Sequence, residues 1–173
     1  MRFWKLICAV SAIILASWPA NAAVVETFRL GGWSGSAFTD DATGRFNNCV
    51  ASAAYRSGIT LYVQVDTTYN WAIGFSAPTW NLTPGQKIPL QFRIDRGAWQ
   101  SGTGTAADKT LVRMPMPDDG YIIKRFRRGR TMYVYDGAYN YEFRLTGTSK
   151  LMARLARCVK RNSSRHGVSP SMG

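Results

Sequence analysis

The chain contains few of the residues from which a catalytic or metal centre is usually built. Its 173 residues include one histidine and three cysteines. The histidine, His166, lies near the end of the chain, so the body of the sequence has no imidazole to activate a serine or cysteine nucleophile. The spacing of cysteine and histidine does not fit a zinc site, and phosphate-binding, dinucleotide-binding and calcium-binding motifs are absent. The sequence therefore predicts a protein that is not an enzyme and has no cofactor or metal.

Long apolar runs are also absent after the first 22 residues, so no later segment is predicted to cross a membrane. Residues 1–22 have the form of a cleavable signal peptide. Arg2 and Lys5 precede an uncharged run at 6–18, and Ala20-Asn21-Ala22 has the small-x-small pattern of a cleavage site. We therefore predict export to the periplasm or the medium, with a mature chain that begins at Ala23.

Cleavage would remove Cys8 and leave an even number of cysteines, Cys49 and Cys158. In an oxidising compartment such a pair is expected to form one disulfide. Two buried free thiols are the alternative.

Acidic residues are too few to balance the basic ones, and the imbalance is confined to one part of the chain. The formal net charge is +12, and loss of Arg2 and Lys5 leaves +10. Residues 23–108 are neutral, with six basic and six acidic side chains, whereas residues 109–173 carry 14 basic and four acidic ones. This asymmetry favours a polyanionic partner.

Alternation of apolar and polar residues predicts that most of the mature chain is β-structure. The pattern is clear at 60–66, 71–76 and 88–94, and weaker at 33–38, 46–53 and 110–114. Pro89 predicts that its strand lies at a sheet edge or begins there. We expect one antiparallel, mainly β domain at 23–161, a sandwich or partly closed barrel, followed by a disordered tail at 162–173.

The clearest hairpin signal lies at 131–145, where Asp136-Gly137 is typical of a two-residue type I′ turn. That turn would place Val134 opposite Tyr139 and Met132 opposite Tyr141. One face of the hairpin would then be apolar, and the other would carry Tyr133, Tyr135 and Arg144.

Two short amphipathic helices are predicted, the second of them C-terminal. They span 118–128, capped by Asp118 and ended by Gly129, and 150–161, capped by Thr148 or Ser149. Cys158 falls on the apolar side of the second helix, where it could meet Cys49 on an early strand.

The basic run at 124–130 leads into the hairpin and is the best candidate for a binding surface. Arginine can form paired hydrogen bonds with phosphate or carboxylate, and tyrosine offers a flat ring to sugars. The candidate residues are Lys124, Arg125, Arg127, Arg128, Arg130, Tyr133, Tyr135 and Arg144. The alternative is a basic surface that is only solvated.

Asp66 and Asp95 each end a predicted strand. A carboxylate pair can hydrolyse glycosides, but aspartate is also a common turn residue, and we favour that role.

Four segments carry a resemblance to known proteins: 31–35 (GGWSG), 44–49 (GRFNNC), 75–85 (FSAPTWNLTPG) and 145–149 (LTGTS). They resemble an uncharacterised exported domain of alphaproteobacteria, found alone or attached to trypsin-like or caspase-like peptidases. The order of a tryptophan strand, a cysteine strand, aspartate-ended strands and a terminal helix with a cysteine is distantly similar to the invasion-associated locus B family. The resemblance spans 31–159, implies a bacterial periplasmic or secreted β-rich module, and brings no catalytic residues.

Together these observations predict a non-catalytic, exported binding module of the bacterial envelope that contacts anionic polymers or glycans through a basic and aromatic surface. The export signal argues against nucleic acid as the partner. The alternative is a protein-interaction accessory domain, for example to a peptidase. An enzyme is the least favoured reading.

Overall fold

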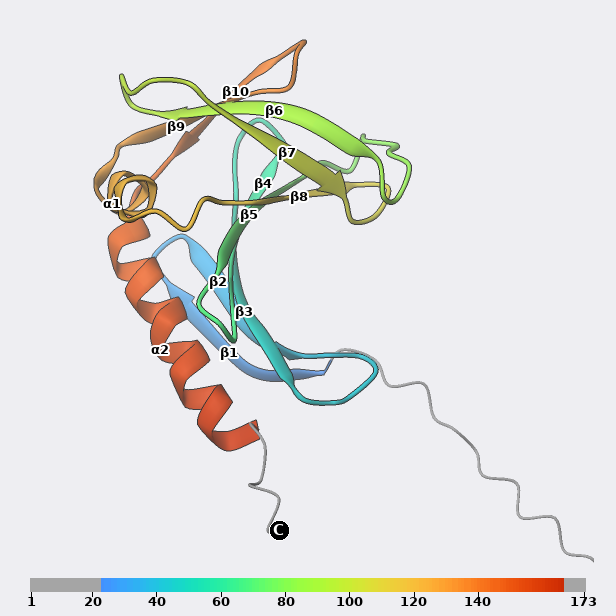
Figure 1. The fold of residues 1–173 in the computed structure, drawn as a ribbon, viewed down its shortest axis with the longest axis vertical. Coiled ribbons are helices and arrows are strands. Elements are labelled where there is room, and N and C mark those ends of the chain that lie inside the picture. Colours follow the sequence, from blue (N-terminus) through green and yellow to red (C-terminus); the bar gives the residue numbers. More distant parts are fainter. Residues whose placement is uncertain (1–22, 167–173) are drawn as a thin grey trace, which may run out of the picture.

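The computed structural model describes residues 23–166, which form one curved antiparallel sheet and two helices (Figure 1). The ten strands have the order β1-β2-β3-β4-β5-β8-β7-β6-β9-β10, so β1 and β10 are the two edges and the sheet is not closed. The strands are β1 (Val24–Leu30), β2 (Trp33–Thr39), β3 (Phe46–Ala54), β4 (Thr60–Asp66), β5 (Trp71–Ser76), β6 (Lys87–Ile94), β7 (Gln100–Ala106), β8 (Leu111–Pro115), β9 (Thr131–Tyr135) and β10 (Asn140–Arg144). The helices are α1 (Gly120–Arg128) and α2 (Thr148–His166). The predicted mainly β architecture with two helices is confirmed.

The sheet bends, so that its two halves lie at different ends of the molecule. In Figure 1, α2 runs beside β1–β3, whereas β6, β7, β9 and β10 cross above the other end. The helix packs against β2, β3 and β4, and α1 lies against α2. No helix among the described residues is long and apolar enough to span a membrane.

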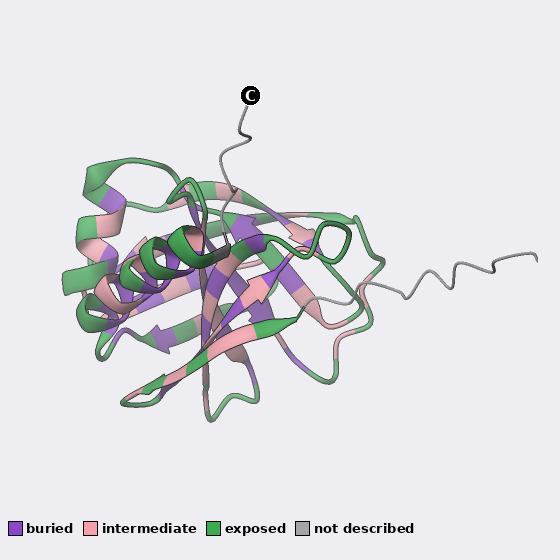
Figure 2. Ribbon diagram, turned by 90° about the horizontal axis from the view of Figure 1, so that it is seen from below, coloured by how far each residue is buried: buried purple, intermediate pink, exposed green. Residues whose placement is uncertain are grey.

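Burial follows the sequence periodicity in the central strands. In β4, Leu61, Val63 and Val65 are buried and alternate with partly exposed residues. Figure 2, in which buried residues are purple, shows such alternation along the strands. In β5 both faces are covered from Trp71 to Phe75. The face opposite Trp71, Ile73 and Phe75 carries the small residues Ala72 and Gly74, and the side chains of Tyr62 and Leu111 lie close beside Gly74.

Two strands, β1 and β7, have no counterpart in the sequence prediction. The sequence of β7, QSGTGTA, is poor in the β-branched and aromatic residues that favour strands, apart from its threonines. Its glycines leave room for neighbouring side chains: a Cβ at Gly104 would lie 2.5 Å from Val112 Cγ1, and one at Gly102 would lie 2.6 Å from Met114 Sδ. Pairing with β6 and β8 therefore decides the conformation of β7.

Pro89 lies in β6, which has neighbours on both sides, so the strand as a whole is not an edge strand. However, β9 pairs with β6 only from Gln91 to Ile94. Pro89 faces Thr103 of β7 and has no partner on the side of β9. The residue thus lies where the strand is locally an edge, and its missing N–H costs no ladder hydrogen bond with β9.

The predicted register of the β9–β10 hairpin is wrong by two residues. Val134 pairs with Tyr141 and Met132 with Phe143, so the turn contains four residues, 136–139. The Asp136 carboxylate organises this longer turn, since its Oδ1 accepts hydrogen bonds from the backbone N–H groups of Ala138 (2.8 Å) and Tyr139 (2.7 Å). A shift of two residues preserves the faces of the strand, and Met132, Val134 and Phe143 are buried as predicted.

Both helix boundaries differ from the prediction. The cap of α1 is Asp119, not Asp118, because Asp119 Oδ1 accepts the N–H of Ile122 at 2.6 Å. Helix α2 continues through residues 162–166, which were assigned to the tail. Asn162 explains the extension: its buried amide donates to the Cys158 carbonyl (2.9 Å) and to Glu26 Oε2 (2.8 Å). The rest of the predicted tail, 167–173, and the predicted signal peptide, 1–22, lie outside the described residues.

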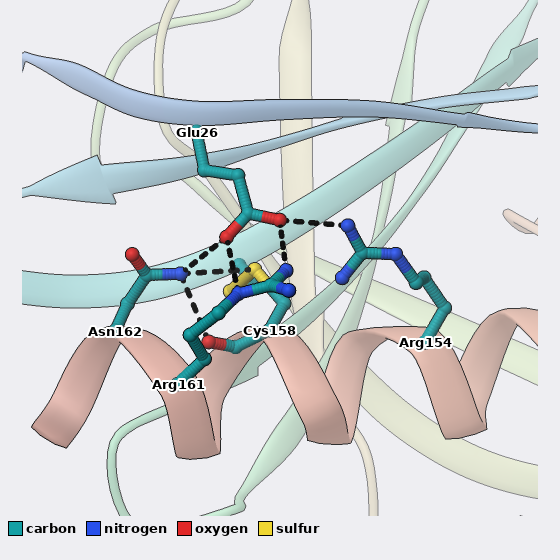
Figure 3. Close-up of a disulfide and its surroundings, with 6 residues drawn as sticks. Glu26, Arg154, Cys158, Arg161 and Asn162 are labelled. Carbon is teal, nitrogen blue, oxygen red and sulfur yellow. Dashed lines mark hydrogen bonds and ion pairs between the residues drawn. A yellow bond between two sulfur atoms is a disulfide. The ribbon is translucent and has the colours of Figure 1, made fainter.

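A disulfide and a partly buried ionic cluster hold α2 on the sheet (Figure 3). Cys49 of β3 is bonded to Cys158 of α2, and both residues are fully buried. This confirms the disulfide predicted from the sequence. Beside it, the Glu26 carboxylate on β1 forms ion pairs with Arg154 (2.7 Å) and Arg161. The position of α2, and of the charges at its beginning, is therefore set by contacts along the whole helix.

Candidate functional site

The basic surface begins with α1, a helix of nine residues whose apolar side is buried against the core. Ile122 and Phe126 are its buried residues, and the Phe126 ring lies 5.2 Å from that of Trp71. The helix ends where the Gly129 N–H donates to the Arg125 carbonyl at 2.6 Å, as the sequence predicted. Because Ile122 and Phe126 face inward, the other side of the helix presents Lys124, Arg127 and Arg128 to solvent.

Asp95 fixes the backbone at the point where the chain enters β9. The backbone N–H groups of Arg130 and Thr131 each donate to Asp95 Oδ1 at 3.0 Å. The Gly129 backbone passes so close to β6 that a Cβ there would lie 2.4 Å from Ile94 Cγ2. These contacts fix where the side chain of Arg130 leaves the backbone.

Thr148 makes the corresponding connection at the start of α2. It was predicted as a possible cap, but it belongs to the helix and is buried. Its hydroxyl donates to the Phe126 carbonyl at 2.8 Å and lies 2.9 Å from the Leu145 carbonyl oxygen. One buried side chain therefore joins the end of α1, the end of β10 and the beginning of α2.

The chain segments that these contacts hold in place, within 127–131 and 142–150, line an open hollow of about 670 Å³, which we call the basic hollow. Its charged side chains are Arg127, Arg130, Glu142, Arg144 and Lys150. Four cations thus face one carboxylate, and they come from α1, the segment before β9, β10 and α2. All five residues are exposed. At physiological ionic strength, salt therefore screens their electric field at distances beyond roughly 8 Å.

The remaining predicted basic residues are separated from this group. Lys124 and Arg128 are exposed on α1 but do not line the basic hollow. Arg125 is turned toward the sheet, where it donates to the Ile94 carbonyl (2.9 Å) and the Tyr121 hydroxyl (2.8 Å). The hydrogen bond to Ile94 joins α1 to β6, so the role of Arg125 is structural.

The predicted tyrosines extend the surface along the outer face of β9. Tyr133 pairs with Glu142 on one side and with Arg93 on the other. The Arg93 guanidinium lies 4.7 Å from the centre of the Trp99 ring and 4.9 Å from that of Tyr133. Tyr135 follows on the same face and donates its hydroxyl to the Gly137 carbonyl at 2.6 Å.

Sequence reasoning missed Lys150, Glu142, Arg93 and Trp99 as members of this surface. Arg93 occupies an outward position in the alternating strand at 88–94, so its face could have been inferred. Its two aromatic neighbours could not, because Trp99 and Tyr133 are brought to it by the β6–β7 loop and by the pairing of β6 with β9.

Both carboxylates considered for hydrolysis accept backbone hydrogen bonds. Asp66 Oδ1 accepts the N–H groups of Thr68 (2.9 Å) and Asn70 (3.0 Å), which confirms the favoured turn role for Asp66. Asp95 lies in the turn after β6, but its carboxylate holds the start of β9 rather than bonding within its own turn. Within residues 23–166 no group of three or more His, Cys, Asp or Glu side chains could hold a metal ion, and the side chain of His166 lies outside the described part of the structure.

No family model and no curated protein matches the sequence. Among solved structures, the chain is similar to invasion-associated protein B from Bartonella henselae. The TM-score is 0.55 at 17% sequence identity, and the alignment covers 79% of this chain and 98% of that chain. At this identity the likeness shows a shared fold, which confirms the distant similarity to the invasion-associated locus B proteins at the level of the fold.

Proposed function

We propose that this protein is an exported, non-catalytic module of the bacterial envelope that binds anionic polymers or glycans through the basic hollow and the aromatic face beside it. The observation that carries the proposal is the convergence of Arg127, Arg130, Arg144 and Lys150 around a single carboxylate. Nothing in the core requires these exposed cations to gather at one point, and their mutual repulsion opposes it. An anionic ligand would relieve that repulsion.

The chemistry of the surface favours a polymer that carries both anionic groups and sugar rings. The three arginines of the basic hollow can each form paired hydrogen bonds with a phosphate, sulfate or carboxylate group. Tyr133 and Trp99, with Arg93 between them, continue the surface with aromatic rings. A chain lying along the outer face of β9 could contact both regions, because Tyr133 and Glu142 are cross-strand neighbours.

Two observations support export, and a third supports a bacterial origin. Residues 1–22, which lie outside the described part of the structure, have the sequence of a cleavable signal peptide. The Cys49–Cys158 disulfide is typical of an oxidising compartment. The likeness in fold is to a protein of a bacterium, Bartonella henselae.

The proposal can be tested by retention on immobilised heparin, lipopolysaccharide and peptidoglycan over a range of salt concentrations. The test variant is Arg127→Gln with Arg144→Gln, and its matched control is Lys124→Gln with Arg128→Gln. Both remove two exposed positive charges, but only the first pair lines the basic hollow.

We expect the hollow variant to bind one of these polymers about 5- to 30-fold more weakly, since two exposed charge contacts contribute roughly 1–2 kcal/mol together. The control variant should lose much less affinity for the same polymer. Equal losses in the two variants would mean that the charge acts only diffusely. Absence of salt-dependent retention on all three polymers would refute the proposal.

A second candidate is the accessory domain that binds a protein, for example a peptidase. It is favoured by two exposed aromatic residues at the β6–β7 loop: Trp99 lies in the loop, and Tyr121 lines a small cleft with Gly97 and Ala98. Trp99→Ala with Tyr121→Ala should then abolish co-purification of a partner that survives moderate salt, whereas the Arg127/Arg144 variant should retain it.

A further inference from the structure

The concave side of the sheet contains a second hollow whose chemistry is the opposite of the basic one. It has a volume of about 280 Å³ and is mainly apolar. Its floor includes Phe75 of β5, Leu90 of β6, Val134 of β9 and Phe143 of β10, all buried within the core. We call this space the apolar cavity.

The apolar cavity arises because α2 covers only part of the sheet. The helix packs on β2, β3 and β4, and the other half of the concave face is closed by its own side chains and by the segment between β5 and β6. Trp80 and Leu82 of that segment line the cavity and are only partly buried. The apolar side chains that line an empty cavity lose dispersion contacts on one side. An apolar ligand of matching size would supply those contacts.

The mouth of the cavity is formed by the β9–β10 turn and carries one charge. Among the described lining residues, Asp136 is the single charged one, and Tyr139 and Tyr141 stand beside it. The Asp136 carboxylate accepts the Tyr141 hydroxyl at 2.8 Å in addition to the two backbone N–H groups of its turn.

These hydrogen bonds determine the ionisation at the mouth. Burial raises the pKa of Asp136, but the backbone N–H groups of Tyr139 and Ala138 and the Tyr141 hydroxyl outweigh it, so the pKa lies below its ordinary value. Burial and the hydrogen bond to Asp136 raise the pKa of Tyr141 to about 12. At neutral pH the mouth therefore presents an anionic carboxylate and a neutral phenol, although the protein as a whole is strongly basic.

We propose that the apolar cavity is a binding site for a small, mainly apolar compound with a neutral or cationic head that donates hydrogen bonds. The apolar body would lie on Phe75, Leu90, Val134 and Phe143, and the head would meet Asp136. The volume suits such a ligand, because a cavity of about 150 Å³ takes up one benzene and drug-sized ligand sites begin at about 300 Å³. A compound with an anionic head, such as a fatty acid, should bind more weakly because the carboxylate repels it.

Two fluorescent probes with the same anilinonaphthalene ring system test this site. N-phenylnaphthylamine is neutral and has one N–H donor, whereas anilinonaphthalene sulfonate carries an additional negative charge. We expect saturable, one-to-one binding of the neutral probe and at least tenfold weaker binding of the sulfonate, a difference of about 1.4 kcal/mol. A general attraction to this basic protein would produce the reverse order, so equal or tighter binding of the sulfonate overturns the proposal.

Variants assign the binding to the cavity. Ile88→Trp fills space at the cavity wall and should weaken binding of the neutral probe at least tenfold. Ile123→Trp changes a similarly half-buried position on α1 that does not line the cavity, and it should leave binding of the neutral probe unchanged. Asp136→Asn removes the negative charge at the mouth, so it should reduce the ratio between the dissociation constants of the sulfonate and the neutral probe. Urea unfolding of each variant establishes that it is folded.

Absence of saturable binding to the wild-type protein, or equal effects of the two tryptophan substitutions, would overturn the assignment. The proposed polymer-binding function does not depend on this cavity. The retention assays on polymers and the probe titrations can therefore fail separately.

Discussion

Replacement of Glu26 by glutamine tests how α2 is held on the sheet. The Glu26 carboxylate of β1 receives hydrogen bonds from Arg154 (2.7 Å), Arg161 and the Asn162 amide (2.8 Å), all from α2. Its side chain is only 16% exposed. Burial raises the pKa of Glu26, but the three hydrogen bonds outweigh this effect and lower the pKa from 4.5 to about 2.

This pKa gives the magnitude of the expected effect. A change from 4.5 to about 2 corresponds to about 3 kcal/mol in favour of the ionised carboxylate in the folded protein. Arg161 is 40% exposed, and solvent screening of that pair reduces the value. We therefore expect Glu26→Gln to lower the free energy of unfolding by about 2–3 kcal/mol near pH 7.

The sign of the pH dependence follows from the lowered pKa. The contribution of Glu26 is complete above its unfolded pKa of about 4.5, and it is lost as the pH falls toward the folded value of about 2. The difference in unfolding free energy between wild type and Glu26→Gln should therefore fall to about half near pH 3 and approach zero below about pH 2.

Urea unfolding with the disulfide intact, followed by the fluorescence of the buried Trp33 and Trp71, measures this difference. Asp41→Asn is the control, because Asp41 is exposed and its side chain forms no ion pair among the described residues. Two results would refute this account of Glu26. One is a decrease in the free energy of unfolding of less than about 0.5 kcal/mol at neutral pH, and the other is a decrease that does not become smaller as the pH is lowered.

Three further changes test the packing around the two candidate sites. Replacing Cys49 and Cys158 together by alanine opens a link across 109 residues, and urea unfolding should show a loss of about 4–5 kcal/mol; a loss under about 1 kcal/mol would contradict the chain-entropy argument. Thr148→Val removes the hydroxyl that serves the Phe126 and Leu145 carbonyls, and we expect thermal unfolding to show a loss of about 1–3 kcal/mol. Gly129→Ala should cost about 1–3 kcal/mol, because its Cβ would lie 2.4 Å from Ile94 Cγ2, whereas Gly120→Ala, with no atom within 4 Å, should be nearly neutral; equal effects would show that the close approach is unimportant.

The strands with alternating apolar residues could be predicted because burial on one face imposes a period of two. Residues 60–66 and 71–76 coincide with β4 and β5 for this reason. The same argument fails for β7, whose glycines and threonines carry little intrinsic preference, and whose conformation is supplied by β6 and β8. The predicted hairpin register is wrong because Asp136-Gly137 is compatible with both a two-residue and a four-residue turn. The hydrogen bonds that the Asp136 carboxylate accepts from the N–H groups of Ala138 and Tyr139 decide between them.

The candidate binding surface was predicted in part. The arginines at 127, 130 and 144 were identified from local charge and from the hairpin face, and they do line one hollow. Arg125 belongs to the same run of sequence, yet its guanidinium is used to bond the Ile94 carbonyl. Local sequence cannot distinguish these roles, because the acceptor for Arg125 comes from a strand 31 residues away.

The amino-acid sequence by itself determined the antiparallel β class, the two amphipathic helices, the even number of cysteines after residue 22 and the confinement of excess positive charge to residues after Asp108. Each of these depends on composition or on a short-range period, which neighbouring residues express directly. Only the tertiary structure decided that Lys150 joins the arginines at one hollow, that Arg93 lies between Trp99 and Tyr133, and that an apolar cavity opens beside Asp136. Those features require elements far apart in the chain to meet, and the bend of the sheet and the docking of α2 determine where they do.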